Sequence, residues 1–136
     1  DFTEAKLTSA DLTDAVANAA NFQKATLVRA NARYAKLNEC DFSRARMPGI
    51  DMSMAQLKSN FAEVDLTKAD LRGSDLSGAN LASADLTGAN LHDAKLFETN
   101  LNGTKMDGAI SATGQRIGPK GLIKKKPKRP WWKFWA

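Results

Sequence analysis

The sequence predicts an all-β fold in which residues 1–110 wind into a square coil, repeated along one axis. Three observations lead to this fold class. Large apolar residues, called centres below, recur every five residues from Phe2 to Met106 and define twenty-two units, with the small Ala17 and Ala32 as exceptions. A small residue, usually Ala, stands two positions before nearly every later centre, with Ile50 and Val64 as larger exceptions. The other three positions of each unit are mostly polar, so we expect two of every five side chains to face inward.

A period of five fits neither regular secondary structure. Five residues advance an α-helix by about 500°, so the centres would spread around its axis. In a strand, an odd period would move the centres to the opposite face at every unit. A chain that bends once per unit avoids both problems, because four units then close one square turn and each centre stacks on another. Twenty-two units predict about five and a half coils, whose backbone groups pair with the coils above and below.

The polar positions of the units are also regular. Asp or Asn commonly stands directly before a centre, where a short polar side chain can bond to the backbone of a corner. A further slot, two residues after the centre, suits a turn conformation that glycine adopts at little cost. Five glycines share this slot: Gly73, Gly78, Gly88, Gly103 and Gly108.

Units such as residues 69–73 (ADLRG) and 79–83 (ANLAS) resemble the A(D/N)LXX units of pentapeptide-repeat proteins. The resemblance extends over about residues 1–110, and twenty-two nearly contiguous units make it specific. It implies a right-handed quadrilateral β-helix, the fold of that family. The square cross-section follows from the period, whereas the handedness is implied by the resemblance alone.

One stretch departs from the pattern. The spacing drops once to four residues, between Leu57 and Phe61, which predicts a local irregularity of the coil there. A tolerated deletion and a kink that shapes a binding face are both consistent with this step. Pro48 and Gly49 also break the pattern, and Met47, Met52 and Met54 lie in the same stretch, where methionine is expected to fill irregular gaps.

The sequence shows no catalytic chemistry. His92, the single histidine, stands in an outward slot without partners at metal-ligand spacing, and is expected to be a surface residue. Cys40 occupies a small inward slot, which favours packing over nucleophilic catalysis. The sequence contains no catalytic triad signature, phosphate-binding loop or dinucleotide fingerprint. We therefore expect a rigid surface rather than an enzyme, with no catalytic residues, cofactor, metal or small-molecule substrate.

The charge divides the chain into two parts. Residues 1–110 carry 12 Lys and Arg against 15 Asp and Glu, a net charge of −3, whereas residues 111–136 carry eight Lys and Arg and no acid. Some pentapeptide-repeat proteins resemble duplex DNA and bind type II topoisomerases, which requires a strongly negative rod. The cations of the first half make this coil locally basic and disfavour such mimicry: Lys6, Lys24, Arg29, Arg33, Lys36, Arg44 and Arg46.

Residues 111–136 are expected to form a linker and an irregular basic tail. The repeat stops after Met106, and residues 110–121 have the composition of a loop or linker. The open end of a solenoid needs a cover, so we expect the apolar residues that follow to cap the last coil: Ile110, Ile117, Leu122 and Ile123. The two resulting domains are the β-helix, 1–110, and the tail, 111–136.

Capping does not explain the end of the chain, where six cations surround two prolines and aromatic residues. The candidate binding residues are Lys124, Lys125, Lys126, Lys128, Arg129, Trp131, Trp132, Lys133, Phe134 and Trp135. A membrane interface takes Trp at the headgroup level and Lys and Arg on anionic lipid. A partner protein would use Trp and Arg as interface anchors, and a nucleic acid would bind the cations through phosphate and the rings through bases. A solubilising tail is the remaining alternative, and nucleic acid is the less favoured partner.

We interpret the chain as a non-catalytic scaffold whose coil presents a rigid face and whose tail anchors it to a membrane protein complex or its anionic lipid. Pentapeptide-repeat proteins are abundant in cyanobacteria and chloroplasts, which suggests a photosynthetic complex and a peripheral place on the thylakoid, lumenal or stromal. A chain that begins at Asp1 rather than Met is expected of a mature organelle protein after transit-peptide removal, or of a fragment. The alternative is a soluble, cytoplasmic interaction protein that acts on a nucleic-acid enzyme.

Overall fold

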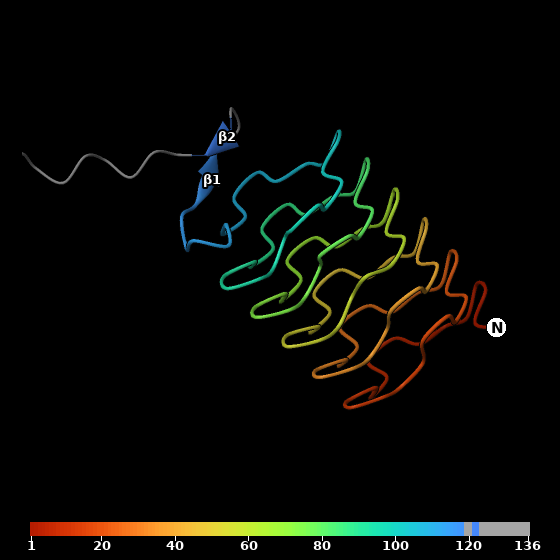
Figure 1. Ribbon diagram of the computed structural model, residues 1–136. Coiled ribbons are helices and arrows are strands. Elements are labelled where there is room, and N and C mark those ends of the chain that lie inside the picture. The colour runs from red at the N-terminus through yellow and green to blue at the C-terminus, as the bar shows by residue number, and fades with distance from the viewer. Residues whose placement is uncertain (119–120, 123–136) are drawn as a thin grey trace, which may run out of the picture.

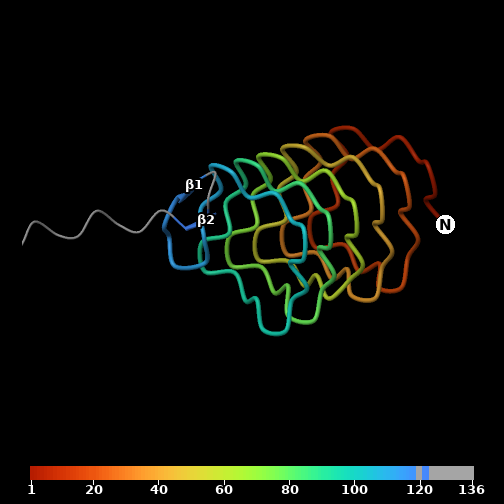
Figure 2. The same ribbon diagram turned by 90° about the horizontal axis from the view of Figure 1, so that it is seen from above.

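The computed structural model describes residues 1–118 and 121–122, and shows a chain wound repeatedly about one axis (Figure 1, Figure 2). Parallel bridges join each coil to the next. The bridged residues are 20 apart, as in Lys6↔Thr26, except across the short step, where they are 19 apart, as in Asp41↔Asn60. Four units therefore close each turn, which confirms the quadrilateral coil expected from the period.

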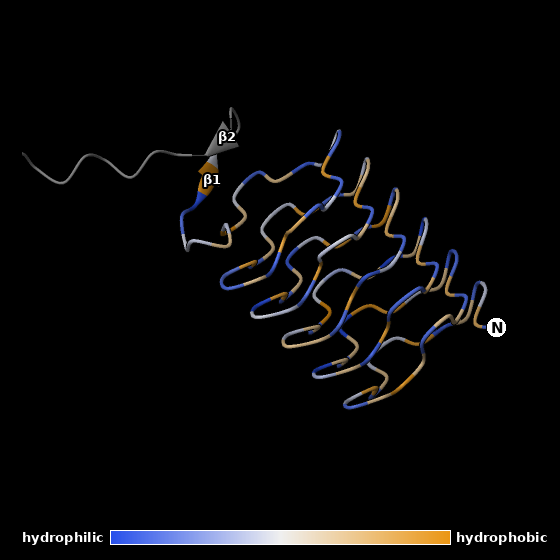
Figure 3. Ribbon diagram, in the orientation of Figure 1, coloured by the Kyte–Doolittle hydropathy of each residue, from blue (hydrophilic) through white to orange (hydrophobic). Residues whose placement is uncertain are grey.

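The coil has four faces, each named here after its first centre: the Phe2, Leu7, Leu12 and Ala17 faces. Hydrophobic and hydrophilic residues alternate along every coil (Figure 3), and the centres of one face form one column. The columns are Phe2–Phe22–Phe42–Phe61–Leu81–Leu101, Leu7–Leu27–Met47–Leu66–Leu86–Met106, Leu12–Ala32–Met52–Leu71–Leu91 and Ala17–Leu37–Leu57–Leu76–Leu96. Consecutive units occupy consecutive sides, so the Leu7 and Ala17 faces lie on opposite sides of the coil.

The core consists of the centre columns and the small residues beside them, as the two inward slots predict. Most centres from Phe22 to Leu91 are almost fully buried. On the Phe2 face, four phenyl rings stack with centroids 4.9, 4.7 and 4.9 Å apart and are nearly parallel. The ladder exposes Phe2 at the first coil and continues as leucine beyond Phe61.

The backbone hydrogen bonds explain why the unit has five residues. The amides of the centre and of the second residue after it donate to the following coil, and the amide before the centre donates to the preceding coil. The amide of the small residue closes a turn onto the carbonyl of the centre three residues earlier. Only the amide directly after the centre lacks a backbone acceptor, which leaves it for a side chain.

The corners require a left-handed backbone. The second residue after the centre has φ between 52° and 72° in every unit except the short one. Gly73 and the four other glycines predicted for this slot adopt this conformation, but so do fifteen non-glycine residues, among them Ser83 with φ 57°. The coil therefore imposes a conformation that L-residues normally avoid, and glycine is not obligatory at the corners.

The irregular stretch is confirmed at the four-residue step, where one corner residue is absent. Met47 and Met52 are fully buried centres, in line with a gap-filling role. The same expectation is wrong for Met54, whose side chain is 53% exposed. Met54 stands in the corner slot, and its thioether lies over Gly73 in the next coil, because glycine leaves room there.

The end of the coil opposite the N-terminus is covered by a short antiparallel pair, β1 (Ile117–Gly118) and β2 (Gly121–Leu122) (Figure 1). The Ile117 amide donates to the carbonyl of Ala109 over 2.7 Å, and the amide of Gly108 donates to the Ile117 carbonyl over 2.7 Å. The Ile117 side chain is buried, as expected of a capping residue, although residues 117–118 and 121–122 form strands rather than a loop. No helix within the described residues is long and apolar enough to cross a membrane.

Candidate interaction surfaces

The tail residues predicted to bind a partner lie outside the described residues, from Lys124 to Trp135. The structure describes the place from which this tail starts. Strand β2 pairs with β1, and β1 is hydrogen-bonded to Gly108 and Ala109. The tail therefore leaves from one end of the coil, beside a defined corner.

Asp and Asn in the slot before the centre bind the amide that the backbone leaves free. Fourteen amides donate such a bond to the side-chain oxygen two residues back, for example Arg72 to Asp70 Oδ1 over 3.1 Å. The Phe2 and Leu12 faces carry Asp or Asn in this slot in every coil from Asp1 to Asn100. These carboxylates are therefore parts of the fold, as expected, rather than acid–base pairs.

Hydrogen bonds from side chains and backbone amides favour the ionised form of several of these carboxylates. The side-chain hydrogen bond from Arg72 lowers the pKa of Asp70 below its ordinary value, and the Ser77 amide lowers the pKa of Asp75. The hydroxyl of Thr87 is the main cause that lowers the pKa of Asp85. Hydrogen bonds to the charged form stabilise it, so acid should weaken the coil.

The Leu7 face departs from this rule in its first three coils. Lys6, Thr26 and Arg46 occupy the slot before the centre there, and none of them binds the following amide. Within the described chain, the amides of Thr8 and Val28 have no hydrogen-bond acceptor, and the third position is Pro48, which has no amide hydrogen. At these positions the residues do not follow the rule that organises the Phe2 and Leu12 faces.

This part of the Leu7 face is also cationic. Residues 6–9, 26–29 and 46–49 contain Lys6, Arg29 and Arg46 and no acid, and all three cations are exposed. None of the three forms an ion pair among the described residues. We call residues 6–9, 26–29 and 46–49 the Leu7-face stripe.

No other face has a comparable excess of positive charge. The Phe2 face has four acids against two cations, and the Leu12 face has five acids against two arginines. On the Ala17 face three acids balance three lysines. Over its whole length the Leu7 face has five cations against three acids, so it is the one face of the described coil with a net positive charge.

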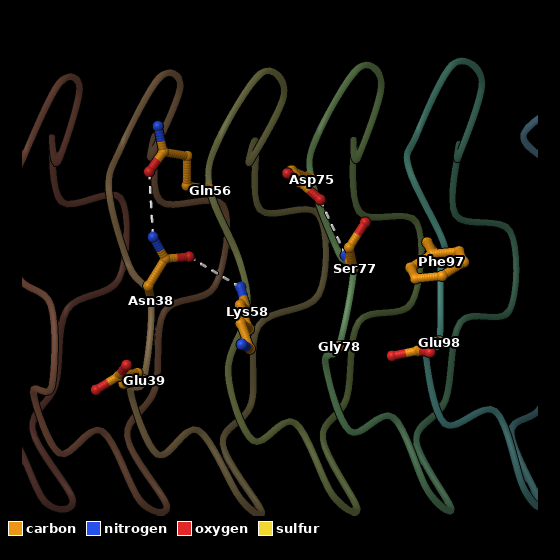
Figure 4. A pocket seen from close by; sticks show the side chains of 9 residues that line it. All are labelled: Asn38, Glu39, Gln56, Lys58, Asp75, Ser77, Gly78, Phe97 and Glu98. Carbon is orange, nitrogen blue, oxygen red and sulfur yellow. Dashed lines mark hydrogen bonds between the residues drawn. The ribbon is translucent and has the colours of Figure 1, made fainter.

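The Ala17 face replaces the missing Asp and Asn with a ladder of carboxamides (Figure 4). The amide of Asn38 donates to Asn18 Oδ1 over 2.9 Å, and the amide of Lys58 donates to Asn38 Oδ1 over 3.1 Å. Asn38 Nδ2 also donates to Gln56 Oε1 over 3.1 Å. Side chains of the preceding coil thus accept two of the amides that follow the centres of this face, those of Asn38 and Lys58. The amides of Asn18 and Phe97 have no acceptor among the described residues.

A hollow of about 440 Å³ opens on this face beside the four-residue step (Figure 4). The absent corner residue leaves space, and the Lys58 stem lies against Gly78. Phe97 borders the hollow with 73% of its side chain exposed. Sequence reasoning did not single out Phe97, although an aromatic residue in an outward slot is the signal that could have done so.

A second hollow, of about 670 Å³, lies on the Leu12 side between Arg33, Met54, Arg72 and His92. Its guanidinium groups are already paired, Arg72 with Asp70 at 2.7 Å and Arg33 with Asp51 at 3.8 Å. The His92 side chain is exposed, as predicted, and lies 3.4 Å from Asp93. These pairs weaken the attraction of the hollow for an anion.

The core holds no nucleophile in a reactive setting. Cys40 is buried, as its small inward slot predicts, and burial raises the pKa of its thiol. Its amide donates to the hydroxyl of Ser59, a residue that sequence reasoning did not single out. In the part of the chain that the structure describes, no three His, Cys, Asp or Glu residues gather as metal ligands would.

The sequence matches the family model for pentapeptide repeats in eight copies, over residues 1–31, 27–59, 59–96 and 74–110. Among solved structures, the pentapeptide repeat protein Rfr23 from the cyanobacterium Cyanothece 51142 is similar, with 29% identity and a TM-score of 0.66. That match covers 67% of this chain and 63% of Rfr23.

Two proteins of Nostoc PCC 7120 are also similar. HetL, a pentapeptide repeat protein involved in heterocyst differentiation regulation, has 30% identity and a TM-score of 0.50, over 84% of this chain and 62% of HetL. A second pentapeptide repeat protein has 36% identity and a TM-score of 0.58. That match covers 60% of this chain and 68% of the Nostoc protein. The chain thus spans slightly less than two thirds of Rfr23 and of HetL. No curated protein sequence matches it.

Proposed function

The chain belongs to the pentapeptide-repeat family, whose fold is a right-handed quadrilateral β-helix, and from this premise we propose that it is a non-catalytic scaffold. Proteins of this family are generally structural or interaction proteins. In our proposal, the coil of about five and a half turns, residues 1–110, presents faces to partners. The tail within residues 111–136 anchors the coil to a membrane protein complex or its anionic lipid.

The observation that carries the proposal is the separation of charge and aromatic residues along the chain. All three tryptophans and eight of the twenty Lys and Arg residues follow residue 110, in a segment without any acid. Trp favours the headgroup region of a membrane, and each Lys or Arg near an anionic surface contributes about 1 kcal/mol. Because β1 and β2 attach the start of this segment to the coil, binding of the tail would hold the coil at the surface.

The scaffold role is supported by what fills the coil. Its interior is occupied by the centre columns and their small neighbours, and its regular carboxylates bind backbone amides. The remaining positions form exposed faces of fixed spacing. Such a body suits binding better than catalysis, which needs converging groups in a cleft.

We further propose a photosynthetic membrane complex as the site of action, with the chain peripheral to a thylakoid. The cyanobacterial origin of Rfr23 and HetL is compatible with this placement. The mixed charge of the coil argues against duplex mimicry, since a mimic needs a negative rod. A soluble protein acting on a nucleic-acid enzyme is therefore the less favoured function.

The test is co-sedimentation of the full chain with vesicles of phosphatidylcholine and phosphatidylglycerol, at low and high salt. A variant with Trp131, Trp132 and Trp135 replaced by Ser removes the aromatic anchors and keeps every charge. We expect the parent chain to sediment at low salt, to be released by salt, and to lose most of its binding in the variant. Equal sedimentation of both chains would refute the role of the aromatic anchors, and no sedimentation of either chain would refute anchoring by the tail.

A further inference from the structure

We propose that the Leu7-face stripe is a second lipid-binding surface, on which the coil lies flat against an anionic membrane. The inference rests on the proposed function, because it takes the membrane as the common partner of tail and coil. It adds an orientation that the tail alone does not determine: the Leu7 face towards the lipid and the Ala17 face away from it.

The first argument is that the stripe lacks a hydrogen bond that the Phe2 and Leu12 faces form in every coil. Asp or Asn before the centre binds the following amide throughout the Phe2 and Leu12 faces. Lys6, Thr26 and Arg46 make no such bond, and the carboxamide ladder that substitutes for it on the Ala17 face is absent from the described residues of the stripe. Positions at which a sequence departs from the rule of its own fold are candidates for function.

The second argument is electrostatic. Lys6, Arg29 and Arg46 are exposed, unpaired among the described residues and free of acids within the stripe, so their positive charge is not cancelled locally. Over the whole coil the Leu7 face has five cations against three acids, whereas the other three faces are neutral or negative in sum. An anionic surface would therefore attract the coil by the Leu7 face in preference to the others.

The third argument is shape. The three cations come from successive coils about 4.8 Å apart, and Val28 and Pro48 stand between them, partly exposed. The two hollows described above lie on the Ala17 and Leu12 sides instead. A face built from a ladder of bridges offers a broad contact, which suits a planar partner such as a lipid surface.

The fourth argument is the position of the tail. Gly108, which donates to Ile117 of β1, stands in the same corner column as Arg29, at the edge of the Leu7 face. The strand pair that precedes the basic tail is therefore attached at the edge of this face. The stripe occupies the first three coils of this face, and the strand pair is attached at the last coil of the same face.

The test places a fluorophore on either side of the full-length chain. Thr8→Cys labels the stripe, and Val16→Cys labels the Ala17 face of the same coil, where Val16 is 70% exposed and its side chain makes no hydrogen bond among the described residues. Cys40→Ala removes the native thiol, and alanine is the residue most common in that slot. Both chains are bound to phosphatidylcholine–phosphatidylglycerol vesicles that carry a headgroup nitroxide quencher.

We expect strong quenching at Thr8→Cys and little at Val16→Cys. Equal quenching at both positions, with tryptophan fluorescence still reporting that the tail is bound, would overturn the stripe and leave the tail anchor standing. No response from either label or from tryptophan would refute both proposals. The three outcomes therefore separate the orientation from the anchor.

A charge-matched pair of variants gives a second readout. Replacing Lys6, Arg29 and Arg46 by Gln should lower the vesicle partition coefficient about fivefold per charge, given the contribution of each cation near the surface. Replacing Lys36, Lys58 and Lys95 by Gln removes the same charge from the Ala17 face and should change the vesicle partition coefficient little. Equal losses in both variants would contradict a localised stripe. Loss of single-stranded nucleic-acid binding in the first variant, with vesicle binding unchanged, would assign the stripe to nucleic acid and overturn the lipid assignment.

Discussion

The hydroxyl of Ser59 accepts the amide of Cys40 over 2.9 Å, across two neighbouring coils. The same hydroxyl donates to the carbonyl of Leu37. In a regular unit the amide at the position of Cys40 donates directly to the carbonyl at the position of Leu37. The Ala35 amide, for example, donates to the Ala32 carbonyl over 3.2 Å. Ser59 thus inserts one hydroxyl into a turn beside the missing residue, so that the Cys40 amide and the Leu37 carbonyl both keep a partner.

We therefore expect Ser59→Ala to destabilise the chain by about 2 kcal/mol, because it leaves a buried amide and a buried carbonyl without partners. Chemical denaturation of the full chain measures this difference. Ser74→Ala is the control: its hydroxyl donates over 2.7 Å to the Leu71 carbonyl, which also accepts the Ser74 amide. The control should cost clearly less. Equal costs would show that Ser59 does not support the short step.

The phenyl ladder of the Phe2 face predicts a graded response at Phe42, which stacks between Phe22 and Phe61. Phe42→Ala should cost about 3–5 kcal/mol, since it opens a cavity in the column. Phe42→Leu should cost much less, because Leu81 fills the same column two coils further on. Thermal unfolding followed by circular dichroism distinguishes the two. Similar costs would mean that the column requires aromatic stacking in addition to volume.

The left-handed corners predict that glycine stabilises positions now held by other residues. Ser83 has φ 57°, so Ser83→Gly should raise the free energy of unfolding by up to about 1 kcal/mol, because it removes the strain of an L-residue there. Ala82→Gly, one residue earlier and without a positive φ, should lower it by roughly 0.5–1 kcal/mol. The denaturation midpoints of the two variants show whether each substitution raises or lowers the free energy of unfolding. A loss in both variants would contradict the strain.

Acid should weaken the coil through carboxylates whose pKa is lowered in the folded state, such as Asp85 beside Thr87. A lowered folded pKa contributes stability above the unfolded pKa, and this stability is lost as the pH falls through the folded pKa. Asp85→Asn keeps an acceptor for the Thr87 amide and removes the titration. The variant should lose less stability than the parent as the pH falls below the ordinary pKa of an aspartate, about 4. Identical pH profiles would exclude Asp85 as a contributor.

The sequence predicts the coil well because one short unit repeats: each slot is seen about twenty times, so the period of five and the two inward slots stand out. The irregularity between Leu57 and Phe61 is predicted for the same reason, as a break in a strict rule. The role of Ser59 is not predictable, since it depends on a hydroxyl reaching the backbone of another coil. The Leu7-face stripe is not predictable from the sequence either. Lys6 and Arg46 look like ordinary surface residues until the structure shows that Asp and Asn in the same slot accept backbone amides on the Phe2 and Leu12 faces.

The most direct test of the tail anchor is the intrinsic tryptophan fluorescence of the full chain, since Trp131, Trp132 and Trp135 are its three tryptophans and all lie in the tail. The chain would be titrated with phosphatidylcholine–phosphatidylglycerol vesicles and with pure phosphatidylcholine vesicles, at low and high salt. Anchoring predicts a blue shift and protection from acrylamide with the anionic vesicles, both reduced by salt. An unchanged emission maximum and unchanged quenching at saturating anionic lipid would contradict the anchor.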